Sequence, residues 1–131
     1  MIKTYNSETF IKPLGKPPVI SFQNSRISFS VEASKLYGLK LGDKISFYIN
    51  DDEKDIIYWS KTNNGLPIQI DAKLKSGNRY RICNRRLSRE LSEHFSVKNK
   101  KSFVVSKENA NICGVKTFFI LKSKQYKSIN K

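Results

Sequence analysis

Short runs of alternating apolar and polar residues fill the stretch between residues 26 and 61, and their spacing predicts a strand, a short helix and two further strands. We expect strands at residues 27–30, 45–49 and 56–60 and a helix at residues 31–37. Ser30 is a favourable N-cap for this helix, and Gly38 is suited to end it because glycine adopts positive φ at low cost. An acidic loop at residues 50–55 joins the last two strands as a hairpin.

The stretch between residues 80 and 122 predicts the same order of elements. We expect strands at residues 80–83, 102–106 and 116–121, a helix from residue 84 to about residue 95, and a longer loop at residues 107–115. Asn84 is the candidate N-cap of this helix. Leu87, Leu91 and Phe95 are spaced by four residues, so they form one apolar stripe along it.

An offset of 56 positions superposes much of the two stretches, and it places Lys44 on Lys100 and Phe47 on Phe103. The chain therefore contains either an internal repeat of two βαββ units or two unrelated stretches that share a generic pattern. In both cases the apolar positions of the helices and strands predict the core. We expect six residues to be buried there: Leu39, Phe47, Leu87, Leu91, Phe95 and Phe103.

We interpret residues 1–131 as a single domain of the α+β class, mostly β, in which two βαββ pseudo-repeats form a barrel or sheet with short helices. Its expected parts are an N-terminal extension (1–25), repeat unit 1 (26–61), a connector (62–79), repeat unit 2 (80–122) and a flexible basic tail (123–131). Three prolines between Lys12 and Pro18 exclude a helix or a central strand there. A short strand is expected at residues 19–22, and residues 67–71 can pair as an extra strand.

Charge changes this picture, because 25 Lys and Arg residues face 11 Asp and Glu residues, giving a net charge of +14. A surplus of this size favours a polyanionic partner, most often nucleic acid. The competing interpretation is an AT-rich genome, which inflates Lys and Asn along the whole chain. Five of the six arginines, however, fall between Arg79 and Arg89. A drift in composition does not concentrate guanidinium groups, which bind phosphate or guanine through two donors at once.

The candidate nucleic-acid-binding residues are Lys73, Lys75, Arg79, Tyr80, Arg81, Arg85, Arg86 and Arg89. Strand alternation places Arg79 and Arg81 on one side of their strand, opposite Tyr80. Tyr80 is a candidate stacking platform for unpaired bases, although a place in the sheet core is the alternative. For the helix, the alternative is a solvated basic face with local ion pairs, Arg86 with Glu90 and Arg89 with Glu93.

The segment from Ile27 to Trp59 resembles the AbrB/SpoVT/MraZ family of swapped-hairpin DNA-binding proteins. The resemblance is carried by Gly38-Leu39-Lys40-Leu41-Gly42-Asp43-Lys44, which matches the family's Gly-Leu-Lys-x-Gly-Asp signature between helix and strand. Ser30 stands where the family usually has Pro, and Ser34 stands where it often has Arg. The resemblance implies an intertwined β-barrel, to which each repeat unit contributes half, and DNA contacts from basic side chains on one of its faces.

Other chemistry has little support in the sequence. His94 is the one histidine and is expected at the surface or its boundary, while Cys83 and Cys113 are expected to be free and mostly buried thiols. The acidic loop at residues 50–55 lacks the glycine and closing glutamate of a calcium loop. No phosphate-binding loop, dinucleotide-binding pattern or nucleophile elbow occurs. We therefore expect no enzymatic activity, no cofactor and no metal.

No apolar run approaches the ~20 residues of a membrane helix, and the start of the chain has no apolar signal region, so we expect a cytoplasmic protein that does not contact membranes. The leading hypothesis is a DNA-binding transcriptional regulator of the AbrB type, which can also form a homodimer. A single-strand binder that uses Tyr80 is the second hypothesis. The third is a structural or interaction protein of a phage or mobile element, whose charge serves a protein partner.

Overall fold

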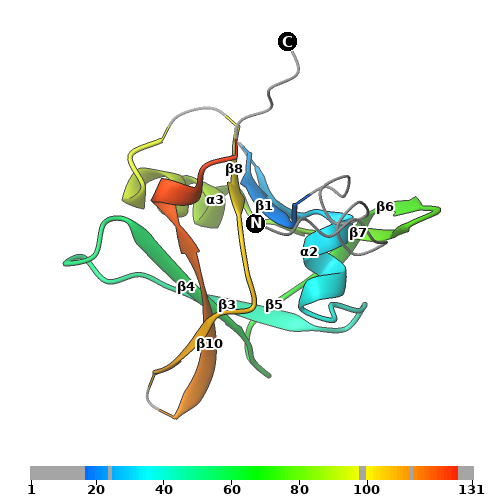
Figure 1. The fold of residues 1–131 in the computed structure, drawn as a ribbon, viewed down its shortest axis with the longest axis horizontal. Helices are drawn as coiled ribbons and strands as arrows, with labels where there is room; N and C mark the ends of the chain where they lie inside the picture. Colours follow the sequence, from blue (N-terminus) through cyan, green and yellow to red (C-terminus); the bar gives the residue numbers. More distant parts are fainter. Residues whose placement is uncertain (1–16, 24, 98–99, 113, 127–131) are drawn as a thin grey trace, which may run out of the picture.

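The structure is a computed structural model that describes residues 17–23, 25–97, 100–112 and 114–126. Its strands are β1 (Val19–Phe22), β2 (Arg26–Phe29), β3 (Lys44–Tyr48), β4 (Ile56–Lys61), β5 (Leu66–Pro67), β6 (Gln69–Leu74), β7 (Gly77–Cys83), β8 (Lys101–Val104), β9 (Asn109–Ile112) and β10 (Val115–Leu121). Its helices are α2 (Val31–Leu36), α3 (Arg85–His94) and the 3-10 turn η1 (Lys122–Lys124). The fold is therefore mostly β with short helices, which agrees with the α+β class at a coarse level (Figure 1).

Sheet A has the strand order β6-β7-β2-β1-β8, with every neighbouring pair antiparallel. Strand alternation gives it two different faces. One row of cross-strand neighbours packs on the core: Ile70, Tyr80, Phe29, Ile20 and Phe103. The adjacent row points the other way and is polar: Gln69, Arg81, Ser28, Ser21 and Ser102. We call this second side the polar face of sheet A.

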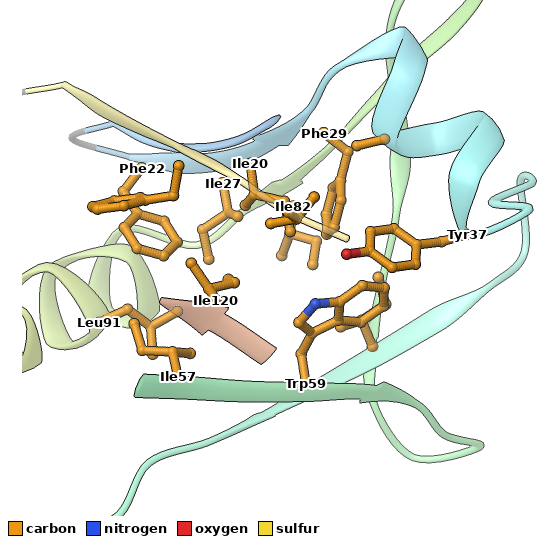
Figure 2. Close-up of a cluster of buried hydrophobic side chains, with 14 of the residues drawn as sticks. Ile20, Phe22, Ile27, Phe29, Tyr37, Ile57, Trp59, Ile82, Leu91 and Ile120 are labelled. Atoms are coloured by element: carbon orange, nitrogen blue, oxygen red, sulfur yellow. The ribbon is translucent and has the colours of Figure 1, made fainter. Parts of the chain in front are cut away.

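Sheet B has the order β5-β3-β4-β10-β9 and contributes Trp59 to the shared core. The Trp59 ring is fully buried and lies 5.7 Å from the ring of Phe29 in sheet A and 4.6 Å from that of Tyr37. Figure 2 shows Ile20, Ile27 and Ile82 of sheet A above Ile57 and Ile120 of sheet B. The two sheets therefore enclose one core, but the described residues do not close into a barrel.

Local signals placed both helices correctly. The Ser30 side chain accepts a hydrogen bond from the Ala33 amide at 3.1 Å, so it caps α2, and Gly38 ends that region with φ +61°. The Asn84 side chain caps α3 by accepting from the Leu87 amide at 2.9 Å. Both N-caps and the Gly38 stop are confirmed, because capping depends on residues three or four positions apart.

Four of the six predicted core residues, namely Leu39, Leu91, Phe95 and Phe103, are buried. Phe47 and Leu87 are only partly buried and pack against the edge of the core. The expected strand at residues 19–22 is also confirmed. It is a central strand of sheet A, between β2 and β8, although it belongs to the stretch expected as an N-terminal extension.

The structure differs from the expectation in three places. The expected connector contains β5, β6 and the start of β7; β6 includes part of the extra strand expected at residues 67–71, and it forms a hairpin with β7 at the edge of sheet A. The expected loop at residues 107–115 contains β9, which pairs with β10. Strand β8 lies beside β1 in sheet A, whereas β3, its expected counterpart, lies beside β4 in sheet B. In the second unit β8 pairs with β1 of sheet A, and this differs from the β3–β4 pairing of the first unit. The second unit therefore does not reproduce the strand pairing of the first.

Candidate nucleic-acid interface

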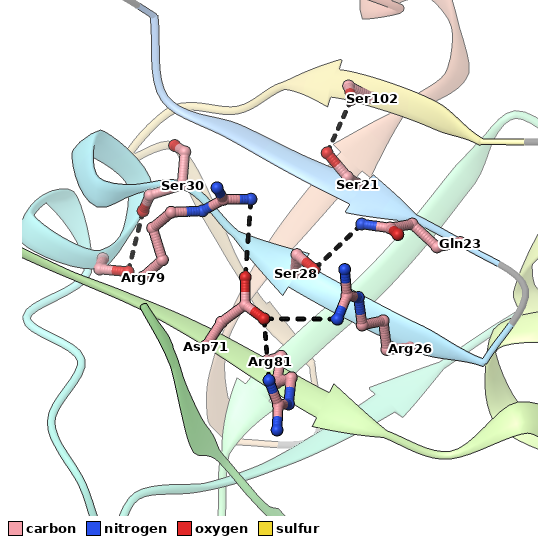
Figure 3. A network of polar contacts seen from close by, with 10 residues as sticks. Ser21, Gln23, Arg26, Ser28, Ser30, Asp71, Arg79, Arg81 and Ser102 are labelled. Carbon is pink, nitrogen blue, oxygen red and sulfur yellow. Dashed lines mark hydrogen bonds and ion pairs between the residues drawn. The ribbon is translucent and has the colours of Figure 1, made fainter. Parts of the chain in front are cut away.

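A carboxylate at the centre of the polar face organises the arginines of sheet A. Strand β6 has an irregularity in its pairing with β7 between Ile70 and Ala72, where Asp71 has no register partner. Such a bulge re-aims one side chain. Here it places the Asp71 side chain, which is only 9% exposed, among the arginines of two neighbouring strands (Figure 3).

Three guanidinium groups converge on Asp71. Its carboxylate lies 3.0 Å from Arg81 Nη1, 3.5 Å from Arg26 Nη1 and 3.6 Å from Arg79 Nη2. We call Arg26, Arg79 and Arg81 the Asp71 cluster. One carboxylate cannot neutralise three guanidinium groups, so the cluster keeps a positive excess on the polar face.

Arg81 is the most enclosed member of the cluster. Its side chain is 30% exposed, and its Nε is buried with no hydrogen-bond partner in the part of the chain that the structure describes. The hydrogen bond to Asp71 raises the pKa of Arg81 above its usual range, so the charge is permanent. With 30% of the side chain exposed, an acceptor can approach the guanidinium group from solvent, although not at the buried Nε.

The predicted arginines of the helix lie beside this cluster. Arg85 and Arg89 line an open hollow of about 480 Å³ together with Gln23. Gln23 also donates from its side chain to Ser28 Oγ at 3.4 Å, and Ser28 is the cross-strand neighbour of Arg81. Gln23 therefore connects the hollow at α3 with the polar face of sheet A.

The start of α3 is fixed in place by a buried serine. Ser88 is fully buried, and its hydroxyl donates to the main-chain carbonyl of Gln23 and, at 3.4 Å, to that of Arg26. Gln23 follows directly after β1, and Arg26 is the first residue of β2. The helix thus holds its exposed arginines at a constant position relative to the Asp71 cluster.

The arginines of α3 are not equivalent. Arg86 forms the predicted ion pair with Glu90, at 3.5 Å between Nε and Oε2. No pair between Arg89 and Glu93 is present among the described residues, although Glu93 also lines the hollow. Arg85 and Arg89 line the hollow, whereas Arg86 is paired with Glu90 on the helix surface.

The lysines of the predicted site occupy the β6–β7 hairpin. Lys73 lies in β6, Lys75 lies in the turn, and both are exposed. Lys73 is the cross-strand neighbour of Asn78, and the next pair along the hairpin joins Ala72 to Arg79. The hairpin therefore extends the basic surface away from the Asp71 cluster.

Tyr80 does not belong to this surface, so its assignment to the binding site is corrected. Its side chain is only 6% exposed, because alternation along β7 turns it into the core with Ile82. Its hydroxyl accepts a hydrogen bond from Asn78 Nδ2 at 3.3 Å. A buried ring cannot stack on a base, and the alternative place in the sheet core is the correct one.

Two further expectations about single residues are wrong. His94 is buried, and its Nε2 donates to the carbonyls of Glu53 at 2.8 Å and Ile56 at 3.0 Å, which joins α3 to the β3–β4 loop. Cys83 is a free thiol as expected, but it is exposed at the end of β7. Cys113 lies outside the described residues.

The structure adds three residues that the sequence did not single out. Arg26 and Asp71 complete the cluster, and Gln23 connects it with α3. Arg26 is the one arginine outside the dense run, and Asp71 is the last acid before it. The Arg26 and Asp71 side chains lie close together because β2 pairs with β7, and no local sequence pattern predicts that pairing.

The described part of the chain shows neither a metal-binding cluster nor a membrane-spanning helix. Within it, no group of three or more His, Cys, Asp or Glu side chains is placed to hold a metal ion. The described helices are also too short and too polar to cross a bilayer. Lys54 and Asp51 of the acidic loop form an exposed ion pair at 3.8 Å.

Comparisons with family models, with curated proteins and with solved structures return no match to this chain.

Proposed function

We propose that this chain is a DNA-binding protein that uses the polar face of sheet A, the start of α3 and the β6–β7 hairpin as one interface. The observation that carries the proposal is the continuity of this surface. The Asp71 cluster, Gln23 and the hollow at Arg85 and Arg89 adjoin one another through a hydrogen bond and a cross-strand pair. Clustered guanidinium groups on one face are the electrostatic footprint of a nucleic-acid interface.

A surface of this kind binds phosphates first. Arginine forks pair with phosphate oxygens through two donors, and the helix start adds free main-chain amides. Such contacts fix the position of the protein on the duplex, whereas base contacts provide the specificity. Because Tyr80 is buried, the interface lacks the aromatic platform on which the single-strand hypothesis depended. Duplex DNA is therefore the ligand that we propose.

The relation to the AbrB/SpoVT/MraZ family and the two pseudo-repeats belong to the same proposal. Equivalent strands of the two units lie side by side: β2 pairs with β7, with Ile27 opposite Ile82, and β4 pairs with β10. Antiparallel pairing of these strands supports an approximate two-fold relation of β2 with β7 and of β4 with β10, in which β3 and β8 do not take part. Gly42 has φ +103°, and the Asp43 carboxylate accepts from the Lys40 amide at 3.0 Å, which suits the Gly-Leu-Lys-x-Gly-Asp turn. A transcriptional regulator is the role that this relation favours.

A titration at several salt concentrations tests the proposal. A fluorescent duplex, its single strand and a labelled polyglutamate of similar charge are the three ligands. We expect the duplex to bind most tightly, with log K falling linearly with log salt. Equal affinity for polyglutamate would replace DNA by an acidic protein partner, and tighter binding of the single strand would reverse the preference that we propose.

Variants of α3 locate the interface. Replacing both Arg85 and Arg89 by Ala should weaken duplex binding and reduce the log–log salt slope by about 2, roughly one for each lost phosphate contact. Arg86→Ala is the matched control on the same helix, because Glu90 already pairs with that guanidinium. A slope that stays the same in the double variant would remove α3 from the interface.

A further inference from the structure

The β6–β7 hairpin projects from the edge of sheet A (Figure 1) and carries an exposed leucine between two lysines. Leu74 is 49% exposed, although it lies in a strand. Its cross-strand partner is Gly77, which has no side chain to cover it. The neighbours Lys73 and Lys75 are exposed as well. Lys73 alternates with Leu74 along β6 and so lies on the other face of the hairpin, while Lys75 lies in the turn.

The turn end of the hairpin lies against α2. An added Cβ at Gly77 would lie 3.0 Å from Val31 Cγ1 and 3.1 Å from Lys35 Cε. Glycine thus lets the hairpin pack closely on α2, and its φ of +143° is one that other residues rarely adopt. Lys35 adds another cation next to the turn, and residues 72–81 contain no acid.

A rigid two-stranded ribbon with this charge has the dimensions of a groove-reading element. Paired strands lie about 5 Å apart, and the major groove of B-DNA, about 12 Å wide, admits a two-stranded β-ribbon. Thymine presents its C5-methyl group in that groove, where an apolar side chain recognises it. The backbone phosphates on either side of the groove attract the flanking lysines.

We propose that the β6–β7 hairpin enters the major groove, where Leu74 contacts thymine methyl groups and Lys73 and Lys75 pair with the adjacent phosphates. This inference rests on the proposed DNA binding and assigns base recognition to one side chain. The Asp71 cluster and α3 then hold the duplex through its backbone, and the tip of the hairpin contributes a preference for A·T-rich sequence.

The contact between Leu74 and the thymine methyl group is tested by combining one protein variant with one base change in the DNA. The probes are a short AT-rich duplex and the same duplex with deoxyuridine in place of thymidine, which lacks the methyl group. We expect the wild-type protein to bind the thymidine duplex about fivefold more tightly, because contact with the methyl group buries part of the leucine side chain. Leu74→Ala should bind both duplexes alike, with the salt slope of the wild type.

Ile112→Ala is the matched control, because Ile112 is 38% exposed near the end of the β9–β10 hairpin. This variant should keep the wild-type ratio between the two duplexes. The inference is overturned if Leu74→Ala retains the thymidine preference, or if the wild-type protein shows none. Absence of salt-dependent binding to either duplex would overturn the proposed function as well, so the two failures are distinguishable.

Discussion

At the scale of single residues, Asp71 decides how three arginines share one surface. Like charges at this spacing repel one another, and the carboxylate offsets that repulsion from a largely buried position. Arg26, Arg79 and Arg81 remain 30–40% exposed, so solvent screens part of the interaction. Asp71 thereby keeps the guanidinium groups oriented without removing their net charge.

We expect Asp71→Asn to lower the free energy of unfolding by about 1–2 kcal/mol. This is less than the ~3–5 kcal/mol of a broken buried ion pair, because the arginines are partly solvated. Urea denaturation at low and high salt measures the effect, and salt should reduce the loss by screening the repulsion between arginines. Asp51→Asn is the control, since Asp51 is exposed. A loss equal to that of the control would show that Asp71 does not stabilise the cluster.

The sequence predicted the structural role of some residues and not of others. The caps Ser30 and Asn84 could be predicted, because each acts on an amide three residues away. The place of Asp71 could not, because a bulge depends on the register of β6 against β7. His94 was misplaced for a similar reason: its partners are main-chain carbonyls of a loop some forty residues earlier in the chain, about which side-chain types give no information.

At the scale of elements, α3 joins the core to the candidate interface. Its apolar stripe contributes Leu91 and Phe95 to the core, while Arg85 and Arg89 face the hollow on its other side. Leu91→Ala should cost about 2–5 kcal/mol of unfolding free energy, because it leaves a cavity beneath the helix. Leu41→Ala is the control, at 63% exposure. Thermal or urea denaturation checks the difference, and a cost for Leu91→Ala as small as that of the control would mean that another face of α3 packs on the core.

Elements with a strong local pattern were predicted, and those defined by distant partners were not. Strands β3 and β4 alternate clearly and join through an acidic loop, so their hairpin was expected. Strand β9 is the sequence Asn109–Ile112, which has little β-propensity and is a strand because β10 pairs with it. The sheet to which β8 belongs was likewise set by β1, far away in the chain.

At the scale of the whole molecule, the two sheets depend on one core. Phe29 of sheet A and Phe118 of sheet B both contact the ring of Trp59, with centroids at 5.7 Å and 5.0 Å. Tyr37, which follows α2, contacts both Trp59 and Phe118. The cluster joins rings from both sheets, which predicts that the sheets unfold together rather than as separate units.

Trp59 makes this prediction testable, because it is the one tryptophan of the chain and is fully buried. Its fluorescence reports on the core, whereas far-ultraviolet circular dichroism reports on the strands of both sheets. We expect the two urea-unfolding curves to have the same midpoint and the same slope, as a two-state transition requires. Leu91→Ala should shift both curves equally, since α3 covers the shared core. If fluorescence changes at lower urea than the strand signal, the sheets are separate cooperative units, and the Asp71 cluster on sheet A then owes its stability to that sheet alone.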